Sequence, residues 1–234
     1  MSFEIEIVDD PARACSVILL SAVMAGGHVV LTGGSTPRQA YRELAQAVRD
    51  LGIDLEDTVF WFGDERCVPA GDDRANYKLA KEALFDPLSD LASLDVKRIQ
   101  GELGHAEGAD AYEQEIKAAG TPRFEVVLMG LGPDAHTASL FPGQPALGEL
   151  SRLVVGVPEA GHEPFVPRIS LTLPALAHTN LMVFLVEGES KADAVLAAFG
   201  PDAKPDPQVP ASMVRPLVSE MLVLLDPAAA AKLP

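Results

Sequence analysis

The chain has 234 residues, of which 48% are hydrophobic and 22% charged, which fits one globular domain over residues 1–234 and excludes wholesale disorder. Asp and Glu number 34 against 18 for Lys and Arg, and the net charge of −16 repels nucleic acid and anionic lipid, so neither is an expected partner. A phosphorylated ligand would need a local patch of cations. Cys15 and Cys67 match no metal spacing and no disulfide framework, which favours a cytoplasmic protein.

The first helix is predicted between Asp10-Pro11 and Gly26-Gly27, which are typical of a helix start and a helix stop. Its apolar run, residues 17–24, is too short to cross a bilayer. Mainly acidic residues precede this run, which argues against a signal peptide. We therefore expect a core-facing helix.

Short apolar runs alternate with helical patterns along the chain, which predicts an α/β fold with a mostly parallel sheet covered by helices. The expected strands are residues 3–8, 28–31, 59–62, 124–129, 153–157, 181–186 and 221–225. The expected helices that follow the first are residues 38–49, 77–84, 109–119 and 191–199. The proline-rich residues 200–210 are interpreted as a loop and not as a domain boundary.

Ligands of such sheets bind beyond the carboxyl ends of the strands, so the segment after each apolar run carries the functional signal. Residues 32–37, 63–66, 130–137 and 187–191 are unusual in this respect. Together they bring glycine, carboxylate, imidazole and cation to one edge of the predicted sheet.

The first of these loops contains the Gly-Gly-Ser of residues 33–35 and leads into a helix, with Thr36 as the predicted N-cap, Pro37 at the first position and Gln39 closing a capping box. Free N–H groups and the positive end of the helix dipole would face an anion there. The alternative is a tight turn in which glycine serves backbone geometry alone. The segment is not a P-loop, and Pro37 excludes a nucleophile elbow.

Lys191 is predicted in the first turn of a helix whose N-cap is Ser190. A cation at this position opposes the helix dipole and costs about 0.3–1 kcal/mol unless an anion lies nearby. Such a broken local rule is typical of a functional site. The alternative is an exposed lysine that pairs with Glu187 or Glu189.

His136 follows a strongly apolar strand, and Asp134 precedes it by two residues. A carboxylate beside an imidazole fixes its tautomer and raises its basicity, which suits a general base near neutral pH. The alternative is a structural histidine bonded to the backbone. The other histidines share no metal-ligand spacing, so no metal is expected. They are His28, His105, His162 and His178.

Asp64, Glu65 and Arg66 directly follow an apolar strand and must lie at the sheet edge. They are interpreted either as a helix cap with a surface ion pair or as contacts to a hydroxyl-rich ligand, with Arg66 available to a phosphate.

Five segments closely resemble the 6-phosphogluconolactonase family, which belongs with the glucosamine-6-phosphate isomerases. They occur in family order across nearly the whole chain, and the third is highly specific. The segments are LTGGSTPRQAY at 31–41, FWFGDERCVP at 60–69, VVLMGLGPDAHTASLFPG at 126–143, RISLTLPAL at 168–176 and VEGESKADAV at 186–195. One departure is Ala135, which stands where we expect Gly and is tolerable unless its φ is positive.

The resemblance implies a three-layer α/β/α sandwich similar to glucosamine-6-phosphate deaminases, ribose-5-phosphate isomerases and CoA transferases. It also implies hydrolysis of 6-phospho-D-glucono-1,5-lactone in the pentose phosphate pathway, with no cofactor, by a monomer or small homo-oligomer. His136 would activate water and Asp134 would orient it or contact the sugar ring. The implied substrate-binding residues are Gly33, Gly34, Ser35, Thr36, Asp64, Glu65, Arg66, Gly132, Arg168 and Lys191.

The candidate donors for the oxyanion are the Gly132 N–H and nearby loop amides. The rival activity is glucosamine-6-phosphate deamination, but that family carries a glutamate five residues after the histidine, where this chain has Phe141. A non-catalytic sugar-phosphate sensor is disfavoured by the charge of −16 and by the intact Asp134–His136 pair.

Overall fold

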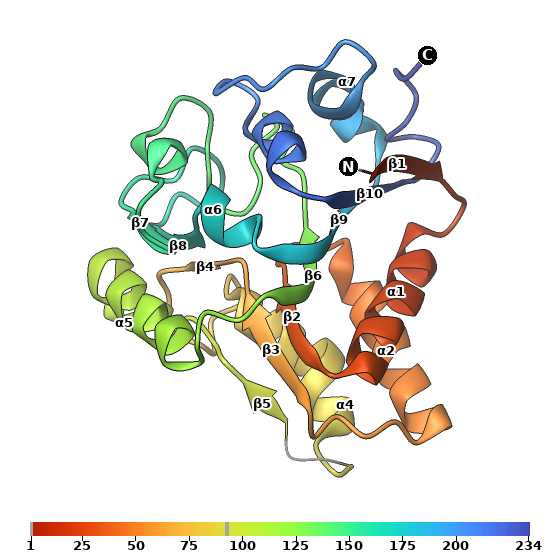
Figure 1. Ribbon diagram of the computed structural model, residues 1–234, viewed down its shortest axis with the longest axis vertical. Coiled ribbons are helices and arrows are strands. Elements are labelled where there is room, and N and C mark those ends of the chain that lie inside the picture. Colours follow the sequence, from red (N-terminus) through yellow and green to blue (C-terminus); the bar gives the residue numbers. More distant parts are fainter. Residues whose placement is uncertain (1, 92–93) are drawn as a thin grey trace.

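A central sheet of seven parallel strands organises the computed structural model, which describes residues 2–91 and 94–234 (Figure 1). The strand order is β1-β10-β9-β6-β2-β3-β5. Every strand expected from the sequence except the one at 153–157 lies in this sheet, which confirms the parallel arrangement. The strands are β1 (Ser2–Ile7), β2 (Gly27–Leu31), β3 (Thr58–Phe62), β5 (Asp95–Val96), β6 (Phe124–Met129), β9 (Thr179–Val186) and β10 (Glu220–Leu225).

A second, antiparallel sheet of three strands has the order β4-β8-β7. Its strands are β4 (Asp64–Arg66), β8 (Arg168–Leu171) and β7 (Val154–Val157). The segment expected as a parallel strand at 153–157 is thus extended but belongs to this smaller sheet. An apolar run is buried equally well in either sheet, so the sequence pattern did not distinguish the two.

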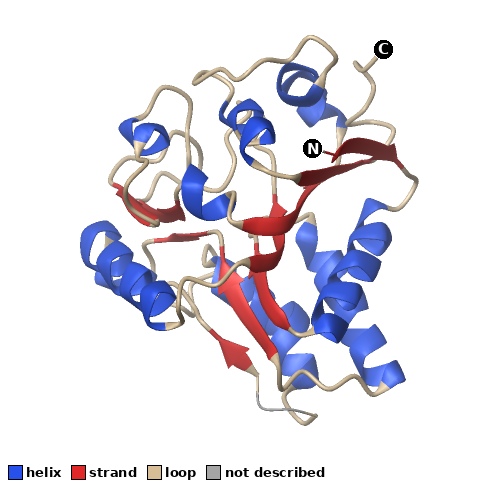
Figure 2. Cartoon of the chain, in the orientation of Figure 1, coloured by secondary structure: helices blue, strands red, loops and turns tan. Residues whose placement is uncertain are grey.

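Helices cover both faces of the central sheet (Figures 1 and 2). Their bounds are α1 (Pro11–Ala25), α2 (Pro37–Leu51), α3 (Asn76–Ala80), a π-helical turn (Lys81–Phe85), α4 (Asp86–Leu88), α5 (His105–Ala118), α6 (Leu173–Leu176) and α7 (Ala192–Phe199). Short 3₁₀ turns occur at Gly101–Leu103, Pro145–Gly148, Glu189–Lys191, Pro210–Met213 and Arg215–Leu217.

Alternate residues of the strands identify which helices cover which face. On β3, Phe60 packs against Phe85 beyond α3, with ring centroids 5.3 Å apart, whereas Trp61 packs against Tyr112 of α5 at 5.9 Å. Phe184 of β9 contacts Phe199 of α7 at 4.9 Å. The register places it on the Trp61 face of the sheet. Helices α5 and α7 therefore cover one face and α1 to α4 the other, which confirms the three-layer α/β/α arrangement.

Helix α1 begins and ends at the residues that the sequence indicates. Asp10 accepts a hydrogen bond from the N–H of Arg13 at 2.9 Å, and Gly26 ends the helix with φ +73°. The helix buries Cys15 and Leu19 completely against the core, as expected. No helix within residues 2–91 and 94–234 is both long and apolar enough to span a bilayer.

The start of α2 corrects one expectation. The helix begins at Pro37 as predicted, but Thr36 already has helical angles and its side chain caps nothing. Gln39 donates to Glu43 at 2.9 Å, one turn along the helix, and so does not close a capping box. Pro37 alone accounts for the position of this helix start, because its fixed φ suits the first turn.

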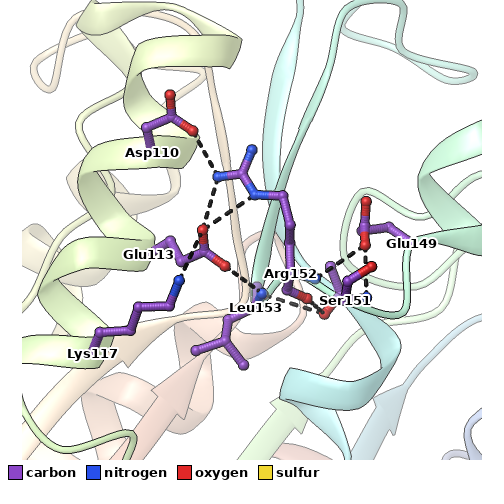
Figure 3. Close-up of polar contacts among 8 residues, drawn as sticks. Asp110, Glu113, Lys117, Glu149, Ser151, Arg152 and Leu153 are labelled. Carbon is purple, nitrogen blue, oxygen red and sulfur yellow. Dashed lines mark hydrogen bonds and ion pairs between the residues drawn. The ribbon is translucent and has the colours of Figure 1, made fainter.

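Helix α5 connects the two sheets. Glu113, which is 8% exposed, accepts hydrogen bonds from Arg152 Nη2 at 3.0 Å and from the N–H of Leu153 at 2.7 Å, just before β7 (Figure 3). The adjacent Tyr112 hydroxyl accepts from the N–H of Phe62 at 2.8 Å, at the end of β3. One helix thus fixes the small sheet against the central one.

Candidate active site

The four unusual loops follow four neighbouring strands, β9, β6, β2 and β3, at the carboxyl edge of the parallel sheet. They surround a cavity of about 220 Å³. Lys191, His136, Gly33 and Asp64 each line it from a different loop. Strand β8 of the small sheet adds Arg168 to the wall.

His136 and Asp134 form a tightly bonded pair. The His136 Nδ1 and the Asp134 Oδ1 lie 2.5 Å apart, and the His136 N–H reaches the same oxygen at 3.2 Å. Because a carboxylate only accepts, Nδ1 carries a proton, and in the neutral imidazole the lone pair is therefore on Nε2. Burial opposes ionisation of Asp134, but the bonds from His136 outweigh it and lower the pKa of the carboxyl. The pair has the geometry of an oriented general base.

Gly132 is required beside this pair because a Cβ there would lie 2.0 Å from His136 Nδ1. The Gly132 N–H donates to the carbonyl of His136 at 2.8 Å. It is therefore occupied in closing the loop, which corrects its candidacy as an oxyanion donor. Gly132 lines the cavity through its backbone.

Ala135 adopts the conformation that would favour the expected glycine. Its φ is +62°, in the left-handed region where a Cβ is unfavourable. Its methyl group is buried, and its carbonyl accepts a hydrogen bond at 3.1 Å from the N–H of Ala211. The loop that carries His136 is therefore held in a strained conformation by this bond and by the bond from the Gly132 N–H to the His136 carbonyl.

Asp64 and Glu65 have different environments although they are adjacent. Asp64 lines the cavity and accepts from Ser139 Oγ at 2.6 Å. Glu65 accepts from the N–H groups of Arg66, Asn76 and Tyr77 at 2.7, 2.7 and 2.8 Å. Its carboxylate secures the start of α3 and does not line the cavity, so its contact with substrate stays a prediction. Burial raises the pKa of Glu65 to about 7, although these hydrogen bonds favour the carboxylate and oppose the shift.

The glycine-rich turn after β2 contributes its two glycines to the cavity. A Cβ on Gly33 would lie 1.7 Å from Oδ1 of Asn76, which explains the glycine there. That buried oxygen has no hydrogen-bond partner among the described residues. Gly34 also lines the cavity, but Ser35 is exposed, Thr36 is half-buried, and neither of them lines it. Contact between these two hydroxyls and substrate therefore stays a prediction.

Two guanidinium groups face the cavity from the small sheet. Arg168 is only 3% exposed, and its Nη2 donates to the carbonyl of Pro164 at 2.7 Å and to that of His162 at 3.2 Å. Burial lowers the pKa of Arg168, the charge of Asp64 opposes this, and the charge of Arg66 adds to it. A buried guanidinium with a second, half-buried one beside it favours an anionic ligand.

Lys191 reaches the cavity from the 3₁₀ turn that precedes α7, which begins one residue later than predicted. Ser190 forms no cap, so its expected N-cap role is corrected. The Lys191 Nζ donates to the carbonyl of Leu131 at 2.7 Å, and within the described residues it forms no ion pair with Glu187 or Glu189. Burial lowers the pKa of Lys191, and the nearby Asp134 opposes this only in part.

Sequence reasoning missed four cavity residues outside the four loops: Asn76, Ala138, His162 and Glu163. The His162 ring lies 5.5 Å from that of His136, measured between centroids. The sequence marks His162 only by its position six residues before Arg168. Metal-ligand spacing along the chain does not detect an imidazole whose neighbour, His136, comes from a distant part of the sequence. In the described part of the chain, no group of three or more His, Cys, Asp or Glu side chains is placed to hold a metal ion.

The fold and the cavity define an α/β protein with a cation-lined cavity at the carboxyl edge of its parallel sheet. The model of the Glucosamine-6-phosphate isomerases/6-phosphogluconolactonase family matches residues 14–223, and the chain belongs to this family. A 6-phosphogluconolactonase of Mycobacterium leprae is 39% identical, with 100% of each chain covered.

Solved structures agree with this assignment. A 6-phosphogluconolactonase from Trypanosoma cruzi superposes with a TM-score of 0.83 at 29% identity, covering 100% of this chain and 98% of that chain. A monomeric glucosamine-6-phosphate deaminase superposes with a TM-score of 0.82, over 99% of this chain and 100% of that chain. Its identity of 17% shows a shared fold alone.

Proposed function

We propose that this chain, acting as one cytoplasmic domain over residues 1–234, hydrolyses 6-phospho-D-glucono-1,5-lactone to 6-phospho-D-gluconate in the oxidative pentose phosphate pathway. Family membership supports the reaction class. The observation that carries the proposal is His136, which is bonded to Asp134 and lines one cavity with Arg66, Arg168 and Lys191. An oriented imidazole beside a cluster of cations suits an electrophile that bears a phosphate.

His136 Nε2 would take a proton from water while the oxygen adds to C1 of the lactone. Asp134 would stabilise the imidazolium that forms, through the bond at Nδ1. A lactone is an activated ester, so neither a covalent intermediate nor a metal is required. General acid–base catalysis of this kind raises the reaction rate by about 10²–10⁴-fold.

The phosphate would lie against Arg66, Arg168 and Lys191, beside the backbone of Gly33 and Gly34. Burial lowers the pKa of both Arg168 and Lys191, so these cations lose hydration in the free protein. A bound dianion would replace that hydration with charge-assisted hydrogen bonds.

The family also contains deaminases, and the surroundings of His136 favour the lactonase. Phe141 is 1% exposed, and its ring centroid lies 4.8 Å from that of His136. An apolar ring cannot hydrogen-bond the imidazole as a glutamate would. We therefore propose that the chain releases no ammonia from glucosamine 6-phosphate.

A single chelated sample tests the proposal. Freshly made lactone is followed by pH-stat with and without the protein after exhaustive EDTA treatment, and glucosamine 6-phosphate is assayed for ammonia in parallel. We expect acid release well above the spontaneous rate and ammonia at background. Ammonia release would overturn the assignment, and loss of lactonase activity on chelation would overturn the metal-free mechanism.

A further inference from the structure

A second imidazole lines the cavity beside His136. The rings of His136 and His162 are 5.5 Å apart between centroids and inclined by 43°. His162 is half-buried and lies in the segment between β7 and β8, whereas His136 is on the loop that follows β6. Two imidazoles in contact across one small cavity provide two separate proton-transfer groups.

The hydrogen bonds of the two rings leave the same atom uncommitted on each. His162 Nδ1 lies 3.0 Å from the carbonyl oxygen of Glu163, and a carbonyl only accepts, so Nδ1 carries the proton. His136 Nδ1 is protonated in the same way toward Asp134. Within the described residues, no hydrogen bond engages Nε2 of either ring. Each Nε2 is therefore available to exchange a proton with a ligand.

Hydrogen bonds from the buried Arg168 guanidinium hold the segment that carries His162. Arg168 Nη2 donates to the carbonyls of His162 and Pro164, and its Nε donates to that of Val166 at 3.1 Å. The guanidinium is 3% exposed in β8, so these bonds lie in a desolvated site. The backbone of His162 is thereby fixed relative to the cavity wall.

We propose that His162 is a second catalytic residue of the hydrolysis, and that its protonated Nε2 donates to the ring oxygen when the bond from C1 to that oxygen breaks. The inference rests on the proposed lactonase function. His136 takes one proton from water, and the water oxygen bonds to C1. The electron pair of the breaking bond goes to the ring oxygen, which receives the proton of His162 and becomes the C5 hydroxyl.

The proton balance closes without a further reactant. After turnover His136 is protonated and His162 is neutral. Transfer of one proton from His136 to His162 through solvent restores the protonation states that the cycle began with. The new carboxylic acid releases its own proton to water. Two positive imidazoles in contact repel each other, so the proposed cycle uses the pair with one ring as base and the other as acid.

The charge around His162 comes from several elements. The charged and titratable groups that line the same cavity are Asp64, Arg66, His136, Glu163, Arg168 and Lys191. They include both signs, and a bound phosphate would add negative charge that favours the protonated form of His162. The acid form is therefore supported when substrate is present.

Two substitutions separate proton transfer from a structural role. His162→Gln places an amide near the position of Nε2 but cannot act as an acid. His162→Asn retains a donor near Nδ1 for the Glu163 carbonyl and removes Nε2. We expect kcat to fall by about 10²-fold in both variants, with KM within about twofold of the wild type. A matched control is Phe165→Leu on the same segment, where the side chain is 71% exposed and does not line the cavity.

The pH profile supplies an independent readout. In the wild type, kcat should fall on the alkaline side as His162 loses its proton, and His162→Gln should lack this limb. A wild-type kcat that does not fall on the alkaline side would overturn the proposal without any variant. Restoration of full kcat by Asn, or a rise in KM with kcat unchanged, would overturn it in favour of a structural or binding role.

The two proposals fail in distinguishable ways. A wild type that releases no acid from the lactone refutes the lactonase function itself. An active wild type with kcat within about twofold in His162→Gln refutes only the role of His162 and leaves His136 to serve as both base and acid.

Discussion

Replacement of Lys191 by Met tests the cation cluster most directly. The substitution keeps the length of the side chain and removes its charge from a half-buried position on the cavity wall. In the proposed mechanism it deletes one charge-assisted contact to the phosphate, worth about 1.5–3 kcal/mol. At 1.36 kcal/mol per tenfold, kcat/KM for the phosphorylated lactone should fall roughly 10- to 150-fold.

The structure also predicts a smaller effect common to all substrates. Lys191 Nζ donates to the carbonyl of Leu131, on the loop that leads to His136, so its loss loosens that loop as well. Unphosphorylated glucono-1,5-lactone reports this second effect alone. The ratio of the two losses isolates the phosphate contact.

The assay compares kcat/KM for both lactones by pH-stat in the wild type, in Lys191→Met and in Lys204→Met. Lys204 is exposed on the loop after α7 and does not line the cavity, so its substitution should leave both values unchanged. An equal fall for both lactones in Lys191→Met would refute the phosphate role and assign the lysine to loop structure.

Three further outcomes are expected. His136→Asn should lower kcat by about 10²-fold or more with KM little changed, and retention of over a tenth of kcat would contradict the general-base role. Gly33→Ala places a Cβ 1.7 Å from the buried Asn76 Oδ1 and should destabilise the fold by about 1–3 kcal/mol, which thermal denaturation measures. The folded-state pKa of Glu65, about 7, lies above its ordinary 4.5, so its stabilising contribution is full below pH 4.5 and lost as pH rises through 7. The unfolding free energy of the wild type minus that of Glu65→Gln, from urea titrations, should decline over that range, and a flat difference would contradict the raised pKa.

The edge of the sheet that carries the site was predictable from sequence because parallel strands share a direction. Once residues 28–31, 59–62, 124–129 and 181–186 are recognised as parallel strands, the segments that follow them must meet at one edge. The structure places all four there. That inference depends on strand direction alone and needs no knowledge of side-chain contacts.

Residue-level placement within these loops was less predictable because neighbours in sequence diverge in space. Ser35 is exposed and does not line the cavity that Gly34 lines. Glu65 accepts from two backbone N–H groups at the start of α3, whereas Asp64 accepts from the Asn76 side chain and also lines the cavity. Such differences arise from backbone turns that no residue pattern encodes. His162 was missed for a related reason, since it lies between β7 and β8 of the small sheet whereas His136 follows β6 of the central one, and only the folded chain brings the two rings together.

His136 and the two guanidinium groups of this cavity lie on different sheets, and helix α5 packs between those sheets. His136 follows β6 of the parallel sheet, whereas Arg66 and Arg168 belong to the small one. In the proposed mechanism the spacing of the two sheets therefore has to match the carbon chain between the lactone carbonyl and its phosphate. Because the bond between Glu113 and Arg152 joins α5 to the segment before β7, we expect substitutions there to change the relative kcat/KM of shorter and longer phosphorylated lactones, although neither residue lines the cavity (Figure 3).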